Sequence, residues 1–403
     1  MKSIAAFLCL VAFALPAAAQ DAQAPPVDPD TLKNLPVPKW ARAALASFSK
    51  PLHPVIGGVA TNGGVGAGIG YNSPDEQRAF TTGKAMFTLR RFWSFEGEIG
   101  RRSLSRRSQI GAFAVVRDMG RLDYFGIGPG TELDNRAAFG LREMTWGARG
   151  WFRLAPALRL GTSISAYKPD LRRTNSSSLR PIEAVFADES VPGLASDPLF
   201  GRYRAFIELR HPAPNYEPLE DTNEYRGAYQ LAFESLHDQG SGRYSLHRWE
   251  FEVQQGFRGL TPNQRLTLHG FLATTNTDAD VPFYLLYTLG GTGGLKTFRP
   301  EMIGGDGTRA TLRGFRNFRF RDRDLVLMQA EYRIPVHKYV RTSVFVDTGQ
   351  VAPRTSELFS DIRGNTGFSV SAVNKGKTLG RMDVGFGGGE GVYFYWSFGA
   401  FQD

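Results

Sequence analysis

The sequence predicts an all-β protein, a transmembrane antiparallel β-barrel of about 16 strands with one long inward-folded loop. Three observations carry this prediction. Segments of about ten residues alternate apolar with polar side chains from residue 65 to the end of the chain. No apolar stretch beyond the first 20 residues is long enough for a membrane helix. Residues 393–401 form a last strand that carries aromatic side chains on both faces.

The alternation is clearest where Trp249, Phe251 and Val253 alternate with Glu250 and Glu252. A soluble β-sandwich shows the same period of two, because one of its faces is also buried. We favour the membrane barrel because the pattern continues without a domain break, which is long for one sandwich. Charges also recur on the polar face of strand after strand, as a water-filled lumen requires.

Turn signals between the alternating segments set the number of strands. We predict strands near residues 65–72, 79–91, 93–103, 108–117, 121–128, 137–153, 157–168, 199–210, 225–236, 244–257, 264–275, 325–335, 339–350, 366–373, 378–386 and 391–401. An even number places both ends of the barrel on the periplasmic side. Short connectors such as residues 91–94 and 154–156 then lie on that side, and the long connectors 169–198 and 276–324 lie outside.

The first 19 residues read as a secretory signal peptide. A lysine, an apolar run and three alanines follow one another there: Lys2, Ile4 to Leu15 and Ala17 to Ala19. We expect cleavage after Ala19, which removes Cys9, the only cysteine. The mature protein would then have no disulfide and no cysteine-based metal site. Residues 20–64 would form a short periplasmic segment and lead-in, and residues 65–403 the barrel, which predicts the bacterial outer membrane as its location.

A long, glycine-rich, basic connector ends in the sequence Leu312-Arg313-Gly314-Phe315. On the two predicted strands that follow, the period of two places Glu331 and Asp347 on the polar, lumen-facing side. The connector is long enough to reach both carboxylates, and one guanidinium can bridge two of them. We therefore expect the loop to fold back into the barrel and to dock through an ion cluster made by Arg313, Gly314, Phe315, Glu331 and Asp347.

These residues carry a resemblance. An L-R-G-F loop, then a strand with E-Y-R-x-P and a strand with V-F-V-D-x-G, resembles the bacterial surface antigen family of outer-membrane barrels, the BamA/TamA-like assembly and translocation barrels. The likeness is densest from about residue 282 to residue 401. In that family the loop arginine pairs inside the barrel with carboxylates on the next two strands, which implies pairing of Arg313 with Asp347 and Glu331. Two glycine pairs, at residues 290–291 and 304–305, precede Arg313 here and suggest an insertion in the loop.

The resemblance implies that the protein assists insertion or translocation of proteins or lipids, through a weak seam between the first and last strands. Residues 65–71, VGAGIGY, are short and glycine-rich and would make a weak first strand. Residues 20–64 are too short for the polypeptide-transport-associated (POTRA) domains of the full-length assembly proteins, which counts against this function. The alternatives are a passive or gated pore plugged by the Arg313 loop, and a surface antigen scaffold without transport.

The resemblance also implies that the last strand is the signal read by the barrel-assembly machinery during biogenesis. Its aromatic residues are Tyr393, Phe394, Tyr395, Trp396, Phe398 and Phe401. Other expected partners are outer-membrane lipid, including anionic headgroups, and an unidentified client polypeptide or lipid.

The net charge of +9 is concentrated between residues 296 and 323. In an exported barrel this charge predicts a lumen lining, contact with phosphate-bearing lipid or plain solvated loop charge, and not nucleic acid. The sequence has no G-x-S-x-G, H-E-x-x-H or phosphate-loop motif. His269 falls on a predicted lumen face, but no serine is placed beside it. We expect no enzymatic activity, no cofactor and no metal.

Overall fold

The computed structural model describes residues 50–73, 78–105, 107–211, 226–261, 263–277, 279–291, 312–374 and 377–397. The predicted signal peptide, the loop residues 292–311, and Phe398 and Phe401 lie outside this part of the chain. The prediction of an all-β antiparallel barrel with 16 strands is confirmed, since 16 of the described strands form one antiparallel sheet.

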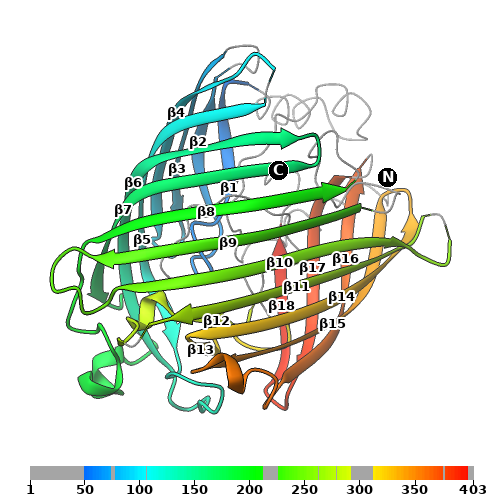
Figure 1. The fold of residues 1–403 in the computed structure, drawn as a ribbon. Helices are drawn as coiled ribbons and strands as arrows, with labels where there is room; N and C mark the ends of the chain where they lie inside the picture. The colour runs from blue at the N-terminus through cyan, green and yellow to red at the C-terminus, as the bar shows by residue number, and fades with distance from the viewer. Residues whose placement is uncertain are drawn as a thin grey trace.

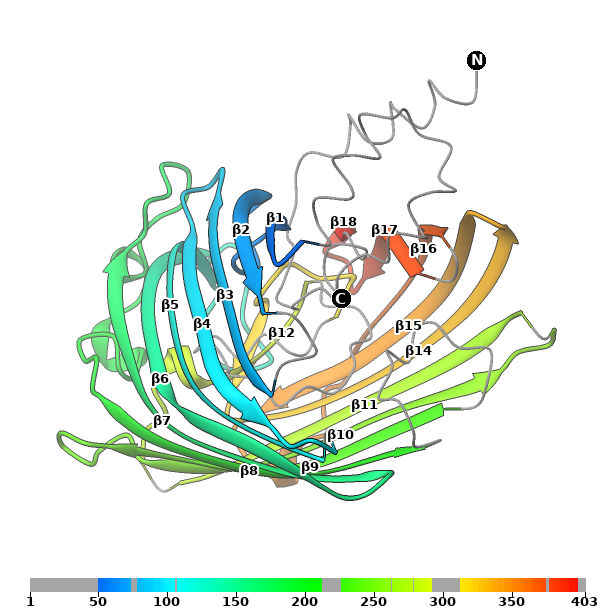
Figure 2. The same cartoon turned by 90° about the horizontal axis from the view of Figure 1, so that it is seen from above.

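Each strand of this sheet pairs with its neighbours along the chain. The strands are β1 (Leu52–Gly57), β2 (Gly66–Asn72), β3 (Ala79–Thr88), β4 (Trp93–Arg102), β5 (Ser108–Tyr124), β6 (Ala137–Ala155), β7 (Leu158–Arg173), β8 (Phe200–His211), β9 (Arg226–Asp238), β10 (Leu246–Arg258), β11 (Arg265–Asn276), β14 (Asp324–His337), β15 (Val340–Ala352), β16 (Arg363–Asn374), β17 (Lys377–Gly387) and β18 (Gly391–Ser397). The sheet curls until its edge strands β1 and β18 come near each other (Figures 1 and 2). Within the described residues, these two strands are not paired with each other.

The strand count agrees with the prediction, but two assignments were wrong. The segments predicted at 108–117 and 121–128 are one strand, β5, because a bulge between Met119 and Leu122 carries the ladder past the interruption. The first strand of the sheet is β1, which precedes the predicted start of the barrel at residue 65. Its six residues include Pro54, which reads as a break in a strand and is tolerated here because β1 is an edge.

The barrel has a loop end, which carries the long β7–β8 and β11–β14 connectors, and a turn end, which carries short turns such as β6–β7. The β3–β4 connector was predicted at the turn end but lies at the loop end. There, Arg90 Nη1 donates a hydrogen bond of 2.8 Å to the carbonyl of Asn62 in the β1–β2 connector. The prediction omitted β1 and counted β5 as two strands, so the total number of strands was still 16. As a result, only the connectors that precede β5 were assigned to the wrong end of the barrel.

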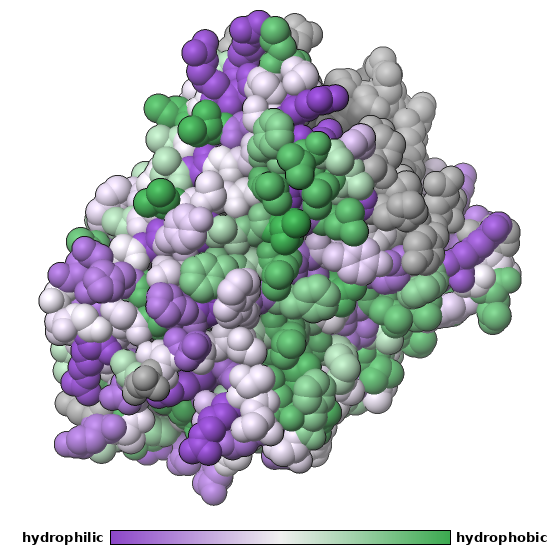
Figure 3. Space-filling model, in the orientation of Figure 1, coloured by the Kyte–Doolittle hydropathy of each residue, from purple (hydrophilic) through white to green (hydrophobic). Residues whose placement is uncertain are grey.

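Side chains on the two faces of the sheet differ as the alternation predicts. Large apolar side chains point outward and are exposed, among them Ile69, Phe95, Ile99, Trp146, Ile164, Ile207, Trp249, Phe251, Val344 and Phe394. On the face seen in Figure 3, hydrophobic residues form a band that crosses the strands. Such a continuous apolar band is the lipid-facing surface of a membrane barrel. No helix among the described residues is long and apolar enough to cross a membrane.

The inner face carries buried charges that pair between strands. Arg149 reaches Glu98 at 2.5 Å, and Arg204 reaches Glu250 at 2.7 Å. Arg159 lies 2.9 Å from Glu208. Because these pairs join strands at separated points of the sheet, the inner wall is polar around much of the barrel.

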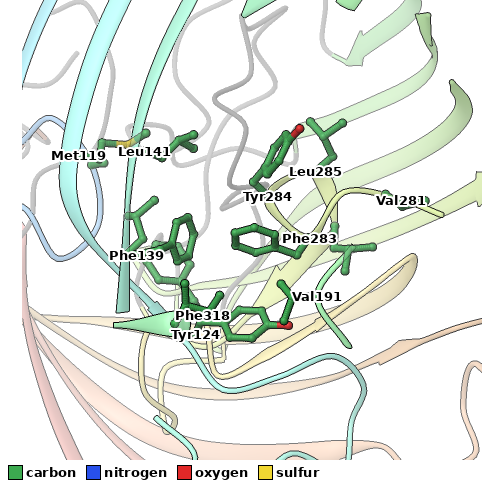
Figure 4. Close-up of a cluster of buried hydrophobic side chains, with 14 of the residues drawn as sticks. Met119, Tyr124, Phe139, Leu141, Val191, Val281, Phe283, Tyr284, Leu285 and Phe318 are labelled. Carbon is green, nitrogen blue, oxygen red and sulfur yellow. The ribbon is translucent and has the colours of Figure 1, made fainter. Parts of the chain in front are cut away.

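The largest apolar cluster lies inside the loop end and is built from connectors as well as strands (Figure 4). Phe283, in a short 3-10 helix (Phe283–Leu285), packs edge-on against Phe139 at 4.8 Å and Tyr124 at 5.4 Å between ring centroids. Arg321 lies within 6.0 Å of the centroids of these three rings and donates a 2.7 Å hydrogen bond to the Phe283 carbonyl. The loop end of the barrel is therefore filled by a packed cap.

Candidate functional site: the loop-docking ion cluster

The β11–β14 connector enters the barrel on a small two-stranded sheet. Its strands are β12 (Tyr287–Leu289) and β13 (Phe320–Asp322), and Tyr287 pairs with Asp322. Gly291 follows β12 with a φ of +92°, and its N–H donates to the carbonyls of Leu312 and Phe315, each at 3.2 Å. The positive φ of Gly291 thus lets its N–H face residues 312 and 315, which lie beside the end of β12.

Arg313 is fully buried, and its guanidinium meets both carboxylates that the sequence predicted. It binds Asp347 with two bonds, from Nε at 2.9 Å and from Nη2 at 2.6 Å. Its Nη1 donates to Glu331 at 3.0 Å, and its backbone N–H adds a 3.1 Å bond to Asp347. The structure therefore brings together Arg313, Glu331 and Asp347, and the bidentate pair fixes the direction of the loop.

Two further charged residues on β17 complete the cluster, and the sequence reasoning missed them. Asp383 accepts a 3.3 Å bond from Arg313 Nη1. Arg381 binds Glu331 with two bonds of 2.8 Å and also binds Asp383 at 2.7 Å. Both fall on the inward face of β17, so their alternation marked them as lumen residues, but nothing in the sequence indicated that β17 lies opposite Glu331.

The cluster is balanced in charge. Arg333 donates to Glu331 at 3.0 Å, so three arginines face three carboxylates within it. Asp347 also accepts hydrogen bonds from two neutral side chains, Gln329 at 3.0 Å and Asn365 at 3.1 Å. A buried cluster whose charges balance avoids the cost of an isolated charge, whereas removal of one member leaves an uncompensated buried charge.

Glycines on β17 let the loop backbone lie directly on the wall. A Cβ at Gly385 would overlap the carbonyl oxygen of Arg313, and a Cβ at Gly387 would overlap that of Gly314. In turn, a Cβ at Gly314 would lie 2.7 Å from the Gly387 nitrogen. The planar side of the Arg313 guanidinium meets the Phe345 ring at 3.4 Å. The glycine-rich end of β17 thus contacts the backbone of the docked loop, and it also leads into the turn between β17 and β18.

Phe315 and the last strand meet at the same place. Phe315 is buried, and its carbonyl accepts a 2.5 Å bond from the Tyr395 hydroxyl. Tyr395 points inward, whereas Phe394 is 61% exposed on the outer face. The aromatic residues of β18 therefore divide between the docked loop and the outer surface. Trp396 ends the part of this aromatic set that the structure describes.

We expect removal of residues 396–403 to block membrane insertion, as the resemblance implies for the last strand. The truncated β18 loses the end of its pairing with β17, where Trp396 lies opposite Met382 and Ser397 opposite Arg381. The measurement is fractionation followed by protease treatment of the periplasm, where the truncated protein should accumulate in a sensitive form. Normal insertion of the truncation would contradict the prediction.

A chain of hydrogen bonds extends from the cluster to β10 and β11. Gln329 binds Asp347 through Nε2 and faces His269 Nδ1 through Oε1 at 2.8 Å. His269 Nε2 lies 3.0 Å from Glu252. His269 is thus a wall residue of the lumen, as its position in the sequence predicted, and it links the docked loop to the neighbouring strands.

The basic residues that follow the loop motif lie inside the barrel and do not face lipid. Arg321 and Arg319 are buried, and Arg319 binds Glu390 at 2.6 Å and the Thr131 hydroxyl at 2.6 Å. Of the three interpretations of this basic run, the lumen lining is therefore the one that describes these two arginines.

Asp322 in β13, which is not part of the 16-stranded sheet, is buried, and burial raises its pKa to about 6. Because the folded-state pKa exceeds the ordinary 3.8, its contribution to stability is present below pH 3.8 and is lost as pH rises through about 6. We expect Asp322→Asn to raise the thermal unfolding midpoint at pH 8 and to leave it unchanged below pH 3.8. The amide oxygen that this substitution introduces would keep the 2.8 Å acceptor bond from the Arg323 N–H. An equal shift at both pH values would contradict this.

Fold and site together define a 16-stranded β-barrel in which an arginine anchors a long connector inside the lumen. Residues 226–399 match the Omp85 superfamily domain. This match agrees with the resemblance to the BamA/TamA-like outer-membrane barrels and points to the bacterial outer membrane. No curated protein matches the chain.

Three solved structures share the fold. BamA from Haemophilus ducreyi lacking POTRA domains 1-3 has a TM-score of 0.58 at 14% identity, over 85% of this chain and 68% of that one. CdiB from Escherichia coli has a TM-score of 0.54 at 10% identity, over 86% and 62%. CdiB from Acinetobacter baumannii has a TM-score of 0.52 at 10% identity, over 82% and 55%. At these identities the likeness concerns the fold alone, and the chain spans less than two thirds of either CdiB.

Proposed function

We propose that this protein assists the insertion or translocation of polypeptides or lipids at the outer membrane, without chemical turnover, by opening the seam between β1 and β18. One observation carries the proposal. In the 16-stranded sheet, strands β2 to β11 and β14 to β17 each pair on both sides, whereas β1 pairs with β2 and β18 with β17 alone among the described residues. An edge in hydrocarbon needs a partner for its backbone groups, and an incoming strand supplies one.

The two edges are suited to weak pairing. β1 has six residues and contains Pro54, which has no N–H to donate. β1 is also short beside β6, which has 19 residues. Few ladder bonds hold such edges together, so the seam is the place where the barrel opens at least cost. The Omp85 superfamily domain and the BamA and CdiB folds support an assembly or translocation role.

A seam-locking experiment tests this function. Cysteine pairs that join Pro54 or Ile56 on β1 to Val392 or Phe394 on β18 would be oxidised in purified protein in vesicles. We expect the protein to accelerate insertion of an unfolded outer-membrane barrel protein, the oxidised seam to stop this, and reduction to restore it. The control pair joins Ile56 to Ala67, which are register partners within the sheet. Insertion that is unaffected by the locked seam, or no acceleration over empty vesicles, would refute the proposal.

Anionic lipid headgroups at the turn end are the second proposed partner. Exposed cations there include Arg101, Arg107 and Arg258. Beside them, Leu104 and Leu260 are 76% and 94% exposed. Cations next to exposed leucines fit a surface of phosphate headgroups above acyl chains. Charge-reversed variants at the three arginines should lose preference for vesicles with anionic over neutral lipid, and an unchanged preference would exclude this contact.

A gated pore is the alternative function, and the docked loop favours it. The Arg313 cluster is buried within the lumen, where an ordered loop obstructs passage. If gating is the function, deletion of residues 292–311 or Arg313→Ala should raise ion conductance in planar bilayers. The control is Arg243→Ala, which removes an exposed pair with Asp280 at the loop end. Equal conductance in all three variants would exclude a pore that this loop closes.

A further inference from the structure

The docked segment of residues 315–319 contacts both sides of the seam. It leaves the ion cluster beside β17 and β18 and then turns toward the connector between β1 and β2. These two regions are far apart in the sequence and belong to opposite edges of the sheet. Because this short segment binds both edges, the seam can open only if the segment loses its contacts on one side.

On the β18 side, two strong hydrogen bonds hold the segment. The Tyr395 hydroxyl donates to the Phe315 carbonyl at 2.5 Å. Arg319 Nε donates to Glu390 in the β17–β18 turn at 2.6 Å, with both side chains largely buried. The Arg313 cluster lies immediately before the segment and anchors it to β17 through Asp383. The segment is therefore bound most firmly to the C-terminal edge.

On the β1 side, the contact is lighter. Asn317 Nδ2 donates a 2.6 Å hydrogen bond to Asn62 Oδ1, across 255 positions of the chain. Asn62 lies in the β1–β2 connector in a left-handed conformation with a φ of +71°, which Arg90 supports by binding its carbonyl. Phe318 is buried in the same apolar cluster as Val59 and Ala60 of this connector.

Phe318 also has a φ of +57°, a left-handed conformation that bulky side chains rarely adopt. Such strain persists only where the surroundings hold the residue in place. Here its N–H donates to the Gly290 carbonyl at 3.3 Å, and its ring is buried in the cap. The backbone is thus bent at the point where the segment passes from one edge to the other.

We propose that residues 315–319 form a latch across the seam, fixed to the β18 edge and releasable from the β1 edge at the Asn62–Asn317 contact. This inference rests on the proposed function in that the seam is what opens. Release of the β1 edge breaks one neutral hydrogen bond and withdraws Val59 and Ala60 from the cluster that contains Phe318, while the charged cluster keeps the segment on β17 and β18. The β1 edge is then the one that moves, and the loop remains docked during opening.

Hydrogen exchange of residues 52–57 in purified protein in nanodiscs measures release of the β1 edge. We expect Asn317→Ala and Asn62→Gly each to speed this exchange about 2- to 10-fold, the range that one net hydrogen bond gives; glycine at position 62 keeps the left-handed backbone without added strain. The double variant should match either single variant, because all three remove the same bond. Arg243→Ala, which breaks an exposed loop-end pair away from the seam, is the control and should change nothing there.

A covalent variant tests the opposite direction. Cysteines at positions 62 and 317, joined by a short thiol cross-linker, should slow exchange of residues 52–57 below the rate of the unmodified protein. Unchanged exchange in Asn317→Ala, an equal rise in Arg243→Ala, or no slowing after cross-linking would overturn the latch. The readout needs no client protein. The exchange experiment can therefore refute the latch even if the protein inserts clients. Conversely, the insertion experiment can refute the proposed function even if the exchange results support the latch.

Discussion

Replacing Arg313 with alanine is expected to release the docked loop. The side chain is fully buried and binds Asp347, Glu331 and Asp383, so its loss leaves three carboxylates with only Arg381 and Arg333 as cations. Loss of one partner from a buried ion pair costs about 3–5 kcal/mol. We expect the released loop to become sensitive to protease, with cleavage near Arg316 and Arg319, in protein that still resists denaturation in detergent until heated.

The Asp347→Ala variant should be milder than Arg313→Ala, because Arg313 keeps Glu331 and Asp383. The double variant should cost less than the sum of the two single variants, since both remove the same bidentate pair. The measurement is the rate of loop proteolysis in all four proteins. Strict additivity, or a loop in Arg313→Ala that is as resistant as in the unchanged protein, would mean that the cluster does not hold the loop.

Gly385→Ala is expected to undock the loop by a steric route that leaves every charge in place. Its Cβ would overlap the Arg313 carbonyl oxygen, which is backbone and cannot rotate away. Inserting atoms into a packed site costs about 1–3 kcal/mol, and more where backbone must move. We expect loop proteolysis to approach the rate of the Arg313→Ala variant.

Gly83→Ala and Gly97→Ala are the matched controls for this substitution. They lie in the same sheet, and their Cβ atoms would meet nothing nearer than 3.7 and 3.8 Å. Both should leave loop proteolysis unchanged. If Gly385→Ala behaves as these controls do, the loop does not rest on β17 as described.

Much of the fold was predictable because a period of two survives in a strand whatever its partners are. The inward positions of Glu331 and Asp347 follow from that period, and the structure buries both. The number of strands was right although two assignments were wrong. Pro54 concealed β1, and the bulge beside Gly120 made β5 read as two strands. Bulges and proline-containing edges depend on neighbouring strands, which local alternation does not record.

The sequence predicted which face of its strand each site residue occupies better than it predicted which residues contact one another. Arg381 and Asp383 were recognisable as polar positions, but the contact of Arg381 with Glu331 and that of Asp383 with Arg313 depend on how the sheet curves between β14 and β17. Likewise, Gly385 falls within a predicted strand, and only the docked backbone shows why a side chain is excluded there. The Asn62–Asn317 contact joins residues that no spacing relates, because it forms across the seam.

Site-specific photo-cross-linking from both sides of the seam during synthesis of a client barrel protein tests the central claim most directly. A photoreactive residue would be placed at Ile56 on β1, at Phe394 on β18 and, as a control, at Ile207 on β8, three outward-facing apolar positions. We expect client adducts from β1 and β18 and none from β8. Adducts from all three positions alike, or from none of them, would contradict a seam that receives the client.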